Sequence, residues 1–562
     1  MGEADGGRSC GTTRELQNLK QQAMEYYRQN DVPRRLEELL NATFYLQPAD
    51  VYGHLDICSV AISTHFEVHE DAPPEQAEAE EAERGSEVST AVQWVNETIT
   101  EELWGIDPSN QEDVDHILRM FFAKKVQEDL ERKELEKSLE DSAMPIAPPP
   151  IPPPPPPPPT KKKGQKPGRK ETLIEKPIPP AEPVEPVLCG SMAIGAVSLA
   201  VAKTSATLDS CPLYLKIASL KHIQEQSATL TLPLLMVSLL SCGKSSPGKL
   251  NLMKEVIGIP HPGLTTRQGM EMLLEIQKHI NKIIETPQII GKMSHLGCLI
   301  INYDTIEQPL LLIQGICANL GLELGTNLHL AINCAGHELM DYGKGKYEVT
   351  VGTLRNAAEM VDMYVELINK YPSIIALIDP FRKEDTEQWD SIYNALGSKC
   401  YIVAGTASQS ICKLLEHGKL SIPKSNALII KHTNQTTMSD LVEITNLIDN
   451  TQHIAVFGST EGESCDDSLV DLAVGLGVRF IKLGGLSRGE RVAKYNRLLT
   501  IEEELVQSGT LGSCEEHTFF YYNEEAEKAT EALEAVSAEA SELFEPSESF
   551  FPTEVVEESA KA

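Results

Sequence analysis

From about residue 297 to residue 510, short apolar runs alternate with amphipathic segments. The short runs are rich in β-branched residues, as buried strands are, and they read CLIINY, LHLAINC, IIALID, CYIVAG, ALIIKH, HIAVFG and VRFIKLGG. Between them, segments such as TLRNAAEMVDMYVELINKY repeat apolar residues at three- and four-residue spacing, which predicts helices. Seven or eight such units within about 210 residues predict an α/β fold whose parallel strands close into a (β/α) barrel. An open doubly wound sheet is the alternative, which the absence of a GxGxxG motif disfavours.

Upstream of the barrel, the pattern predicts a smaller α+β region and a set of linking helices. Residues 1–122 combine helical segments, among them 13–45, with the alternating segment DICSVAIST (56–64), which reads as a strand. Residues 188–296 open with an apolar, small-residue helix at 189–220, and we assign them to linking helices and the start of the barrel.

Residues 123–187 are predicted to be a disordered insertion or linker. Charged residues dominate 123–141, Pro152–Pro159 is unbroken proline, and the basic stretch KKKGQKPGRK follows. Proline runs adopt an extended polyproline II conformation and do not pack into a core. The insertion is therefore a solvated spacer or, through residues 145–170, a docking site for a proline-binding module or an acidic protein partner.

The charge and cysteine content narrow the class of protein. The net charge of −34 would repel a phosphate backbone, so we expect no nucleic-acid binding. Acidic residues gather in 70–88 and in 511–562, which we read as an acidic tail. The longest apolar run, Leu230–Leu240, is too short to span a bilayer, and no signal peptide is visible. We therefore expect no membrane contact. The twelve cysteines form no C-x-x-C pair, so we expect a cytoplasmic protein with reduced thiols.

Polar residues stand at the ends of several predicted barrel strands. In (β/α) barrels the working side chains lie at the carboxyl ends of the strands. Asn333, Asp379, Lys431 and Lys482 each follow or end one of the apolar runs. A lysine in that position is often a snorkelling side chain, but two lysines at one barrel mouth suggest a functional pair.

Several motifs resemble the enolase family. RGERVAKYNRLLTIEEEL (488–505) resembles the C-terminal signature of the family, and IKLGG before it resembles the strand that carries an active-site lysine. YPSIIALIDPF resembles the family's "EDPF" strand, and GAVSLAVAKT with PLYLKIA resembles the long helix that precedes the barrel. The similarity is clear over 189–510 and weak over 56–120. It implies an enolase-like (β/α)8 barrel preceded by a smaller α+β domain, and a homodimer.

The resemblance also implies a reaction. Enolases dehydrate 2-phosphoglycerate to phosphoenolpyruvate in glycolysis: a lysine removes the proton α to the carboxylate, and two Mg²⁺ ions stabilise the resulting intermediate. Lys431 in LIIKHT matches the proton acceptor. Lys482 in FIKLGG and Glu255 in LMKEVIGIP match substrate-binding residues, although Lys254 replaces the family's glutamine just before Glu255.

The positions that hold Mg²⁺ in the family have changed. Asn333 replaces an aspartate, Ile378 replaces a glutamate, and Gly405 with Thr406 replaces a pair of aspartates. Because Mg²⁺ prefers anionic oxygen ligands, these residues make a poor site. Three nearby acids could complete another one: Glu338, Asp341 and Asp379. We expect Asp379 not to substitute for position 378, since neighbouring strand residues point to opposite faces.

Further family positions differ as well. The phosphate-binding His-Arg-Ser becomes Ser459, Thr460 and Glu461, an active-site histidine becomes Ser246, and the second glutamate falls at His295 or Leu296. Two hypotheses therefore stand: an enolase-type lyase with an altered metal site, or an enolase-fold scaffold or docking protein with impaired catalysis.

Overall fold

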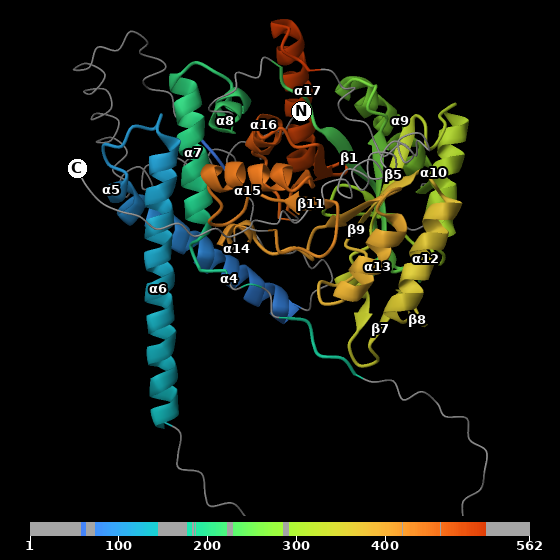
Figure 1. Ribbon diagram of the computed structural model, residues 1–562, viewed down its shortest axis with the longest axis horizontal. Coiled ribbons are helices and arrows are strands. Elements are labelled where there is room, and N and C mark those ends of the chain that lie inside the picture. The colour runs from blue at the N-terminus through green and yellow to red at the C-terminus, as the bar shows by residue number, and fades with distance from the viewer. Residues whose placement is uncertain are drawn as a thin grey trace, which may run out of the picture.

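The computed structural model describes residues 58–62, 74–143, 177–182, 185, 187–221, 229–284, 291–416, 418, 420–460 and 462–512. The centre of the described structure is a closed eight-stranded barrel surrounded by helices (Figure 1). The wall strands, in order, are β1 (Leu234–Gly243), β2 (Leu252–Pro260), β5 (Leu328–Asn333), β9 (Ile374–Ile378), β10 (Tyr401–Ala404), β11 (Ala427–Ile430), β12 (Ile454–Gly458) and β13 (Phe480–Gly484). Pairing of β13 with β1 closes the ring, which confirms the predicted barrel.

One wall strand runs against its neighbours. β2 is antiparallel both to β1 and to β5, whereas the other wall pairs are parallel. The start of β2 therefore lies at the rim where the other strands end, and this orientation brings residues from β2 into the barrel mouth.

The predicted strand CLIINY is not part of the wall. β4 (Leu299–Ile301) pairs with β3 (Gly291–Met293) and with the C-terminal part of β1, at Leu240 and Ser241. The first two wall strands are instead β1 and β2, which lie within 188–296. An apolar run of strand length has the same pattern in a barrel wall and in an added hairpin, so the sequence did not separate the two.

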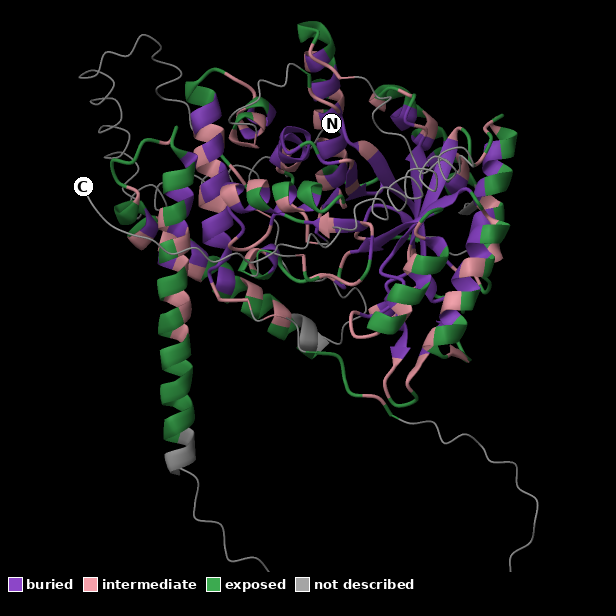
Figure 2. Ribbon diagram, viewed as in Figure 1, coloured by how far each residue is buried: buried purple, intermediate pink, exposed green. Residues whose placement is uncertain are grey.

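Helices cover the outer face of the barrel. They are α9 (Thr266–Ile284), α10 (Glu307–Asn319), α12 (Ala357–Lys370), α13 (Thr386–Leu396), α14 (Ile411–Glu416), α15 (Met438–Asn450), α16 (Ser468–Gly475) and α17 (Gly489–Ser508). A short helix, α11 (Gly336–Leu339), and a small sheet of β6 (Met340–Asp341), β7 (Lys346–Thr350) and β8 (Thr353–Arg355) follow β5. Burial is densest in the strands (Figure 2), where one apolar cluster fills the barrel interior and a larger one lies beneath the helices.

The described part of the N-terminal region is helical. It contains α4 (Pro74–Gln93), the π-helix η1 (Trp94–Ile99), α5 (Thr100–Glu102) and α6 (Gln111–Ala143), and after the insertion come α7 (Met192–Leu208) and α8 (Leu213–Lys221). Residues 58–62 form no strand, so the predicted strand at 56–64 is wrong over the part that the structure describes. The predicted helices at 13–45 lie outside the described residues.

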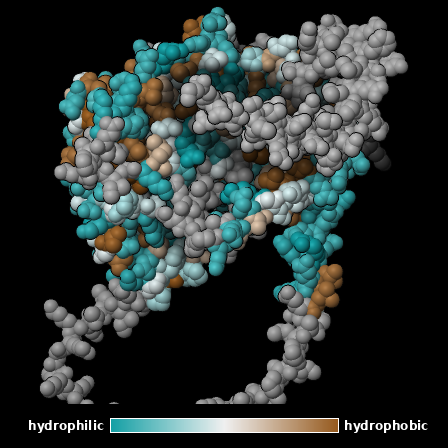
Figure 3. All heavy atoms as spheres, turned by 180° about the vertical axis from the view of Figure 1, so that it is seen from behind, coloured by the Kyte–Doolittle hydropathy of each residue, from teal (hydrophilic) through white to brown (hydrophobic). Residues whose placement is uncertain are grey.

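Helix α6 crosses the predicted boundary between residues 122 and 123. Its first part packs against α7, and its later part extends away from the barrel with exposed side chains (Figures 1 and 2). Ion pairs one turn apart, such as Lys125–Glu128 at 2.8 Å and Lys133–Asp129 at 2.7 Å, support the projecting part. Its surface is mainly hydrophilic (Figure 3). Residues 123–143 are thus helical rather than extended, because charges spaced by a helical turn stabilise a helix that has no core to join.

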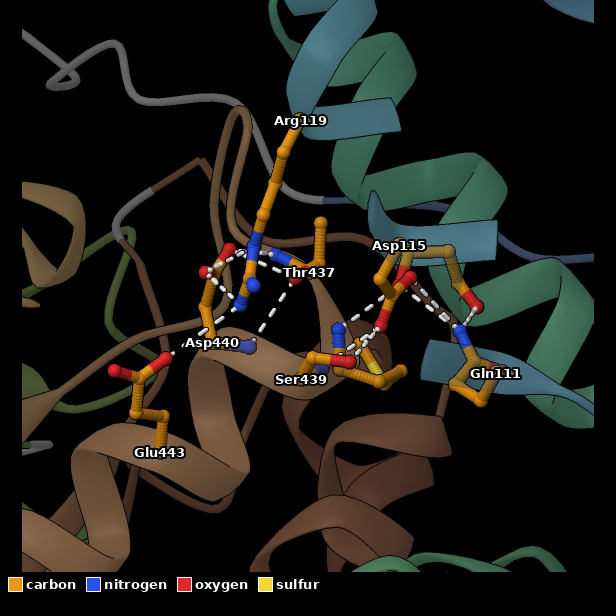
Figure 4. Close-up of polar contacts among 9 residues, drawn as sticks. Gln111, Asp115, Arg119, Thr437, Ser439, Asp440 and Glu443 are labelled. Carbon is orange, nitrogen blue, oxygen red and sulfur yellow. Dashed lines mark hydrogen bonds and ion pairs between the residues drawn. The ribbon is translucent and has the colours of Figure 1, made fainter. Parts of the chain in front are cut away.

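The N-terminal helices hold the start of α15 through a buried polar junction (Figure 4). Asp115 on α6 accepts hydrogen bonds from the Ser439 amide at 2.8 Å, the Ser439 hydroxyl at 2.7 Å and the Ser198 hydroxyl at 2.6 Å. Ser198 on α7 in turn accepts from the Met438 amide at 2.9 Å. Burial raises the pKa of Asp115, and these hydrogen bonds oppose the rise. The first amides of α15, which have no partner within the helix, are therefore satisfied from the N-terminal region.

A second contact lies beside the first. Arg119 on α6 donates to the Asp440 carboxylate at 2.6 and 2.9 Å, and Asp440 also forms a capping box with Thr437. The segment between Lys431 and α15 is thus fixed at its C-terminal end by α6 and α7.

Replacing Asp115→Ala should lower the free energy of unfolding by about 2–3 kcal/mol, since buried donors on Ser439 and Ser198 lose their acceptor. Urea denaturation measures this. The control is Asp113→Ala, two residues earlier on the exposed face of α6, which should lose less than about 1 kcal/mol. Equal losses for the two variants would contradict a structural role for the junction.

Candidate functional site

A cavity of about 260 Å³ opens at the mouth of the barrel. Glu255 from β2, Lys431 after β11 and Lys482 on β13 all line it. The three residues predicted from the sequence therefore lie in one cavity. The antiparallel direction of β2 is what places Glu255 there, since residue 255 is near the start of its strand.

Glu255 is the buried centre of this site. One of its oxygens accepts from the Lys482 ammonium at 2.7 Å and from the Asn333 amide at 2.7 Å, and the other accepts from the Ser238 hydroxyl. Burial by itself would raise the pKa of Glu255. The positive charge of Lys482 and the three hydrogen bonds outweigh burial and lower the pKa to about 2. Glu255 is thus a permanent anion that fixes the Lys482 ammonium at the cavity wall.

Lys431 lies across one intervening strand from Lys482. β12 separates β11 from β13, and its last residue, Gly458, is in register with Lys482. A Cβ atom at Gly458 would lie 2.7 Å from a methyl carbon of Ile429 and 3.7 Å from Cγ of Lys431. The absence of a side chain at this position leaves room for Ile429, next to which Lys431 lies at the mouth.

The three positions that the resemblance assigns to metal ligands offer no carboxylate. The Asn333 side chain donates to Glu255 and accepts from the Ala335 amide at 3.2 Å, so it is already used. Ile378 is buried in the apolar cluster of the barrel interior. Gly405 has no side chain. These three residues line the cavity, but two of them supply no ligand atom from a side chain.

Asp379, one of the three acids considered for another metal site, reaches the mouth. β9 ends at Ile378, and Asp379 adopts a left-handed conformation with φ of 46°, so strand alternation no longer applies to it. Its carboxylate accepts from the amides of Gly405 at 2.8 Å, Thr406 at 2.8 Å and Ala407 at 3.1 Å. A Cβ atom at residue 405 would lie only 2.7 Å from an Asp379 oxygen. The carboxylate therefore occupies the space that a side chain at position 405 would need.

The other acidic candidates point elsewhere. Glu338 pairs with Lys254 at 2.8 Å, and Asp341 pairs with Lys344 at 2.9 Å within its own turn. Among the described residues, no three His, Cys, Asp or Glu side chains gather in a way that could hold a metal ion. Because Mg²⁺ prefers several anionic oxygen ligands, this donor set does not fit the metal that the family resemblance implies.

The loop after β12 is held by a buried arginine. Arg491 on α17 donates to the Ser459 hydroxyl, to the Thr460 carbonyl at 2.9 Å and to the Leu483 carbonyl at 3.3 Å. Ser459 and Thr460 line the cavity, whereas Glu461 lies outside the described residues. The C-terminal signature thus contributes a support for the cavity wall. Of the remaining predicted positions, Leu296 lines the cavity, and Ser246 and His295 are not among its lining residues.

Comparisons with known proteins agree with the fold. The family model "Enolase, C-terminal TIM barrel domain" matches residues 229–518. The chain is 72% identical to Enolase 4 of Homo sapiens, covering 100% of this chain and 99% of the relative. It is 63% identical to Enolase 4 of Mus musculus over 100% of both chains, and 38% identical to Enolase 4 of Danio rerio over 89% and 93% of the two chains. The chain belongs to the enolase family.

Sequence reasoning missed several members of this enolase-family site. Ser238 supports Glu255 from β1, and the only signal was a serine in an otherwise apolar run. Lys254 was noted only as a replacement, yet it lines the cavity beside Glu255. Arg491 was part of a quoted motif, but its burial and its contacts with the β12 loop depend on how α17 packs.

Replacing Lys482→Met should lower the free energy of unfolding by about 3–5 kcal/mol at pH 7, because a buried carboxylate loses its cation. The wild-type pair contributes its full stability above pH 4.5, the ordinary pKa of a glutamate, and loses it as the pH falls toward 2. The difference between the two proteins should therefore shrink in acid, as urea denaturation at several pH values measures. The control is the double variant Glu255→Gln/Lys482→Met, which should lose less stability at pH 7 than Lys482→Met alone. An equal loss of stability in the two variants would show that the unpaired charge is not the cause.

Replacing Gly405→Ala should lower the free energy of unfolding by about 1–3 kcal/mol, since the new methyl group would collide with the Asp379 carboxylate. The matched control is Gly315→Ala on the exposed face of α10, where a Cβ atom meets nothing within 4 Å. The control should be neutral or stabilised by up to about 1 kcal/mol. A Gly405→Ala variant as stable as the control would contradict the position assigned to Asp379.

Proposed function

We propose that this enolase-family protein binds 2-phosphoglycerate and phosphoenolpyruvate at the barrel mouth, with Lys431 as the proton acceptor in their interconversion. The observation that carries the proposal is that Lys431, Lys482 and Glu255 line one cavity. The family resemblance supplies the reaction, and the cavity supplies the two lysines that the reaction needs.

The proposed roles follow from the contacts of each residue. The Lys482 ammonium is fixed by Glu255 and faces the cavity, where it would neutralise the carboxylate of the substrate. Lys431 approaches from another strand, so it can take the proton α to that carboxylate without competing for the same oxygen atoms. Reduced charge on the carboxylate makes the α proton more acidic.

Purified protein should convert 2-phosphoglycerate to phosphoenolpyruvate, and Lys431→Ala should reduce the rate by about 100-fold or more, because general base catalysis contributes that much. Absorbance of the enol product measures the rate. Lys424→Ala, just before β11 and outside the cavity lining, serves as the control made in the same host. An equal and negligible rate in the wild type and in Lys431→Ala would overturn the catalytic role.

A docking role is the second candidate. The segment after the insertion is anchored on the barrel: Glu182 pairs with Lys383 at 2.8 Å, and Glu185 accepts from the Ser410 amide at 3.1 Å. A second cavity, of about 290 Å³, is lined by Glu185 and also by Lys431. The proposed docking segment for a proline-binding or acidic partner, 145–170, lies outside the described residues, but the chain that follows it contacts the barrel as far as Glu185, which lines the second cavity.

By the same resemblance we propose a homodimer and a glycolytic role, and from cysteines that form no C-x-x-C pair we propose a cytoplasmic location. Among the described helices, none has both the length and the apolar character that a membrane crossing requires. The Mg²⁺ of the family is not included in the proposal, because the donor set described above does not fit it.

A further inference from the structure

The segment that leads from the insertion to α7 lies along the rim of the barrel (Figure 1). We call its described residues, 177–182, 185 and 187, the strap. The Ile178 amide donates to the Tyr342 carbonyl at 3.2 Å, and the Glu182 amide donates to the Glu384 carboxylate at 3.0 Å. The strap therefore passes from the small sheet that follows β5 to the loop that precedes α13.

Two glutamates of the strap contact the barrel with the spacing of a polyproline helix. Five of the eleven residues that the strap spans in the sequence are proline, which favours polyproline II, where every third residue lies on the same side. Glu182 pairs with Lys383 at 2.8 Å. Three residues later, Glu185 accepts from the Ser410 amide at 3.1 Å and lies 3.7 Å from the Lys413 ammonium. The spacing of the two acids thus matches the spacing of the cations on the rim.

The strap forms part of the wall of the second cavity. Glu185 and Val187 both line this cavity of about 290 Å³. The second cavity lies beside the first, because the two share the lining residues Gly405, Thr406, Ile429, Lys431 and Thr433. Release of the strap would therefore uncover the side of the mouth where Lys431 lies.

The contacts that hold the strap are of a weak kind. The side chains of Lys383 and Glu182 are 36% and 69% exposed, and those of Lys413 and Glu185 are 45% and 29% exposed. Exposed ion pairs contribute little to stability and are screened by salt. The helix that follows is held differently, since α7 buries apolar side chains against the rest of the protein. The strap can therefore leave the rim while α7 stays packed.

We propose that the strap is a side gate of the barrel mouth, which leaves the rim and returns to it while the barrel stays folded. In the closed state, which the structure shows, Glu182 and Glu185 hold the strap across the second cavity. In the open state the second cavity and the adjoining side of Lys431 face solvent. A protein that binds the strap as an extended, proline-rich peptide would favour the open state, because it competes with the rim for the same glutamates. The inference goes beyond the proposed function and does not depend on the reaction at Lys431.

Alkylation of Cys412 by iodoacetamide measures how often the gate is open. Cys412 is on α14 and lines the second cavity but not the first. Burial raises the pKa of its thiol to about 12, so the thiol should react slowly until the strap leaves. Peptide mass spectrometry gives the rate at this one cysteine, and the exposed Cys465 serves as the reference within the same protein.

Glu182→Gln and Glu185→Gln should each raise the rate at Cys412 by about twofold to fivefold, because each variant loses an exposed ion pair. Sodium chloride at about 1 M should raise the rate in the wild type, since it screens these pairs. The same salt should have a smaller effect in Glu182→Gln/Glu185→Gln, which has already lost them. The rate at Cys465 should stay the same throughout.

Two controls separate release of the strap from a general loss of structure. Glu387→Gln removes an acid from the exposed face of α13 and should leave the rate at Cys412 unchanged. Glu182→Lys/Lys383→Glu restores the ion pair with its charges exchanged and should return the rate toward that of the wild type. Melting curves check that every variant is folded.

Equal rates at Cys412 in the wild type, Glu182→Gln and Glu185→Gln would overturn the gate. A wild-type Cys412 that reacts as fast as Cys465 would also overturn it, because the strap would then not shield the second cavity. Neither measurement uses 2-phosphoglycerate, so the gate and the proposed reaction fail independently of each other.

Discussion

The buried carboxylate of Glu255 organises the mouth of the barrel. It accepts hydrogen bonds from Ser238 on β1, Asn333 on β5 and Lys482 on β13, while it is itself on β2. Four strands therefore meet at one anion close to the place where β13 pairs with β1 and the barrel closes. The Glu255 carboxylate would be strongly destabilising if it were buried without a cation. Pairing of β13 with β1 brings the Lys482 ammonium to it, so closure of the barrel and the ion pair stabilise each other.

The same mouth holds Lys431 and Lys482 but has no carboxylate at Asn333, Ile378 or Gly405. Ile378 extends the apolar interior to the rim, and the Asp379 carboxylate occupies the space beside Gly405 under three backbone hydrogen bonds. These changes are compatible with one another: an aspartate at 405 would collide with Asp379 as it is now placed.

The N-terminal helices also support the barrel mouth indirectly, through the segment between Lys431 and α15. Asp115 and Ser198 satisfy the first amides of α15, and the Gly195 amide donates to the carbonyl of Asn434 at 3.0 Å in the segment that follows Lys431. Helix α6 then continues outward as a charged helix and leads to the proline-rich insertion. The support of the Lys431 segment and the start of the insertion are therefore parts of one helix.

The sequence by itself determined the barrel, six of its eight wall strands, and the residues Glu255, Lys431 and Lys482, because apolar periodicity and specific motifs are local properties of the chain. It did not separate β4 from the wall, and it did not reveal the antiparallel direction of β2, since neither depends on local pattern. Strand alternation did not fix the position of the Asp379 side chain, because β9 ends at Ile378 and alternation holds only while a strand continues. Only the tertiary structure brought Lys254 to the cavity and placed Ser238 and Arg491 behind residues that line it. Their roles depend on contacts between segments far apart in the chain, and such contacts are decided by packing rather than by neighbouring residues.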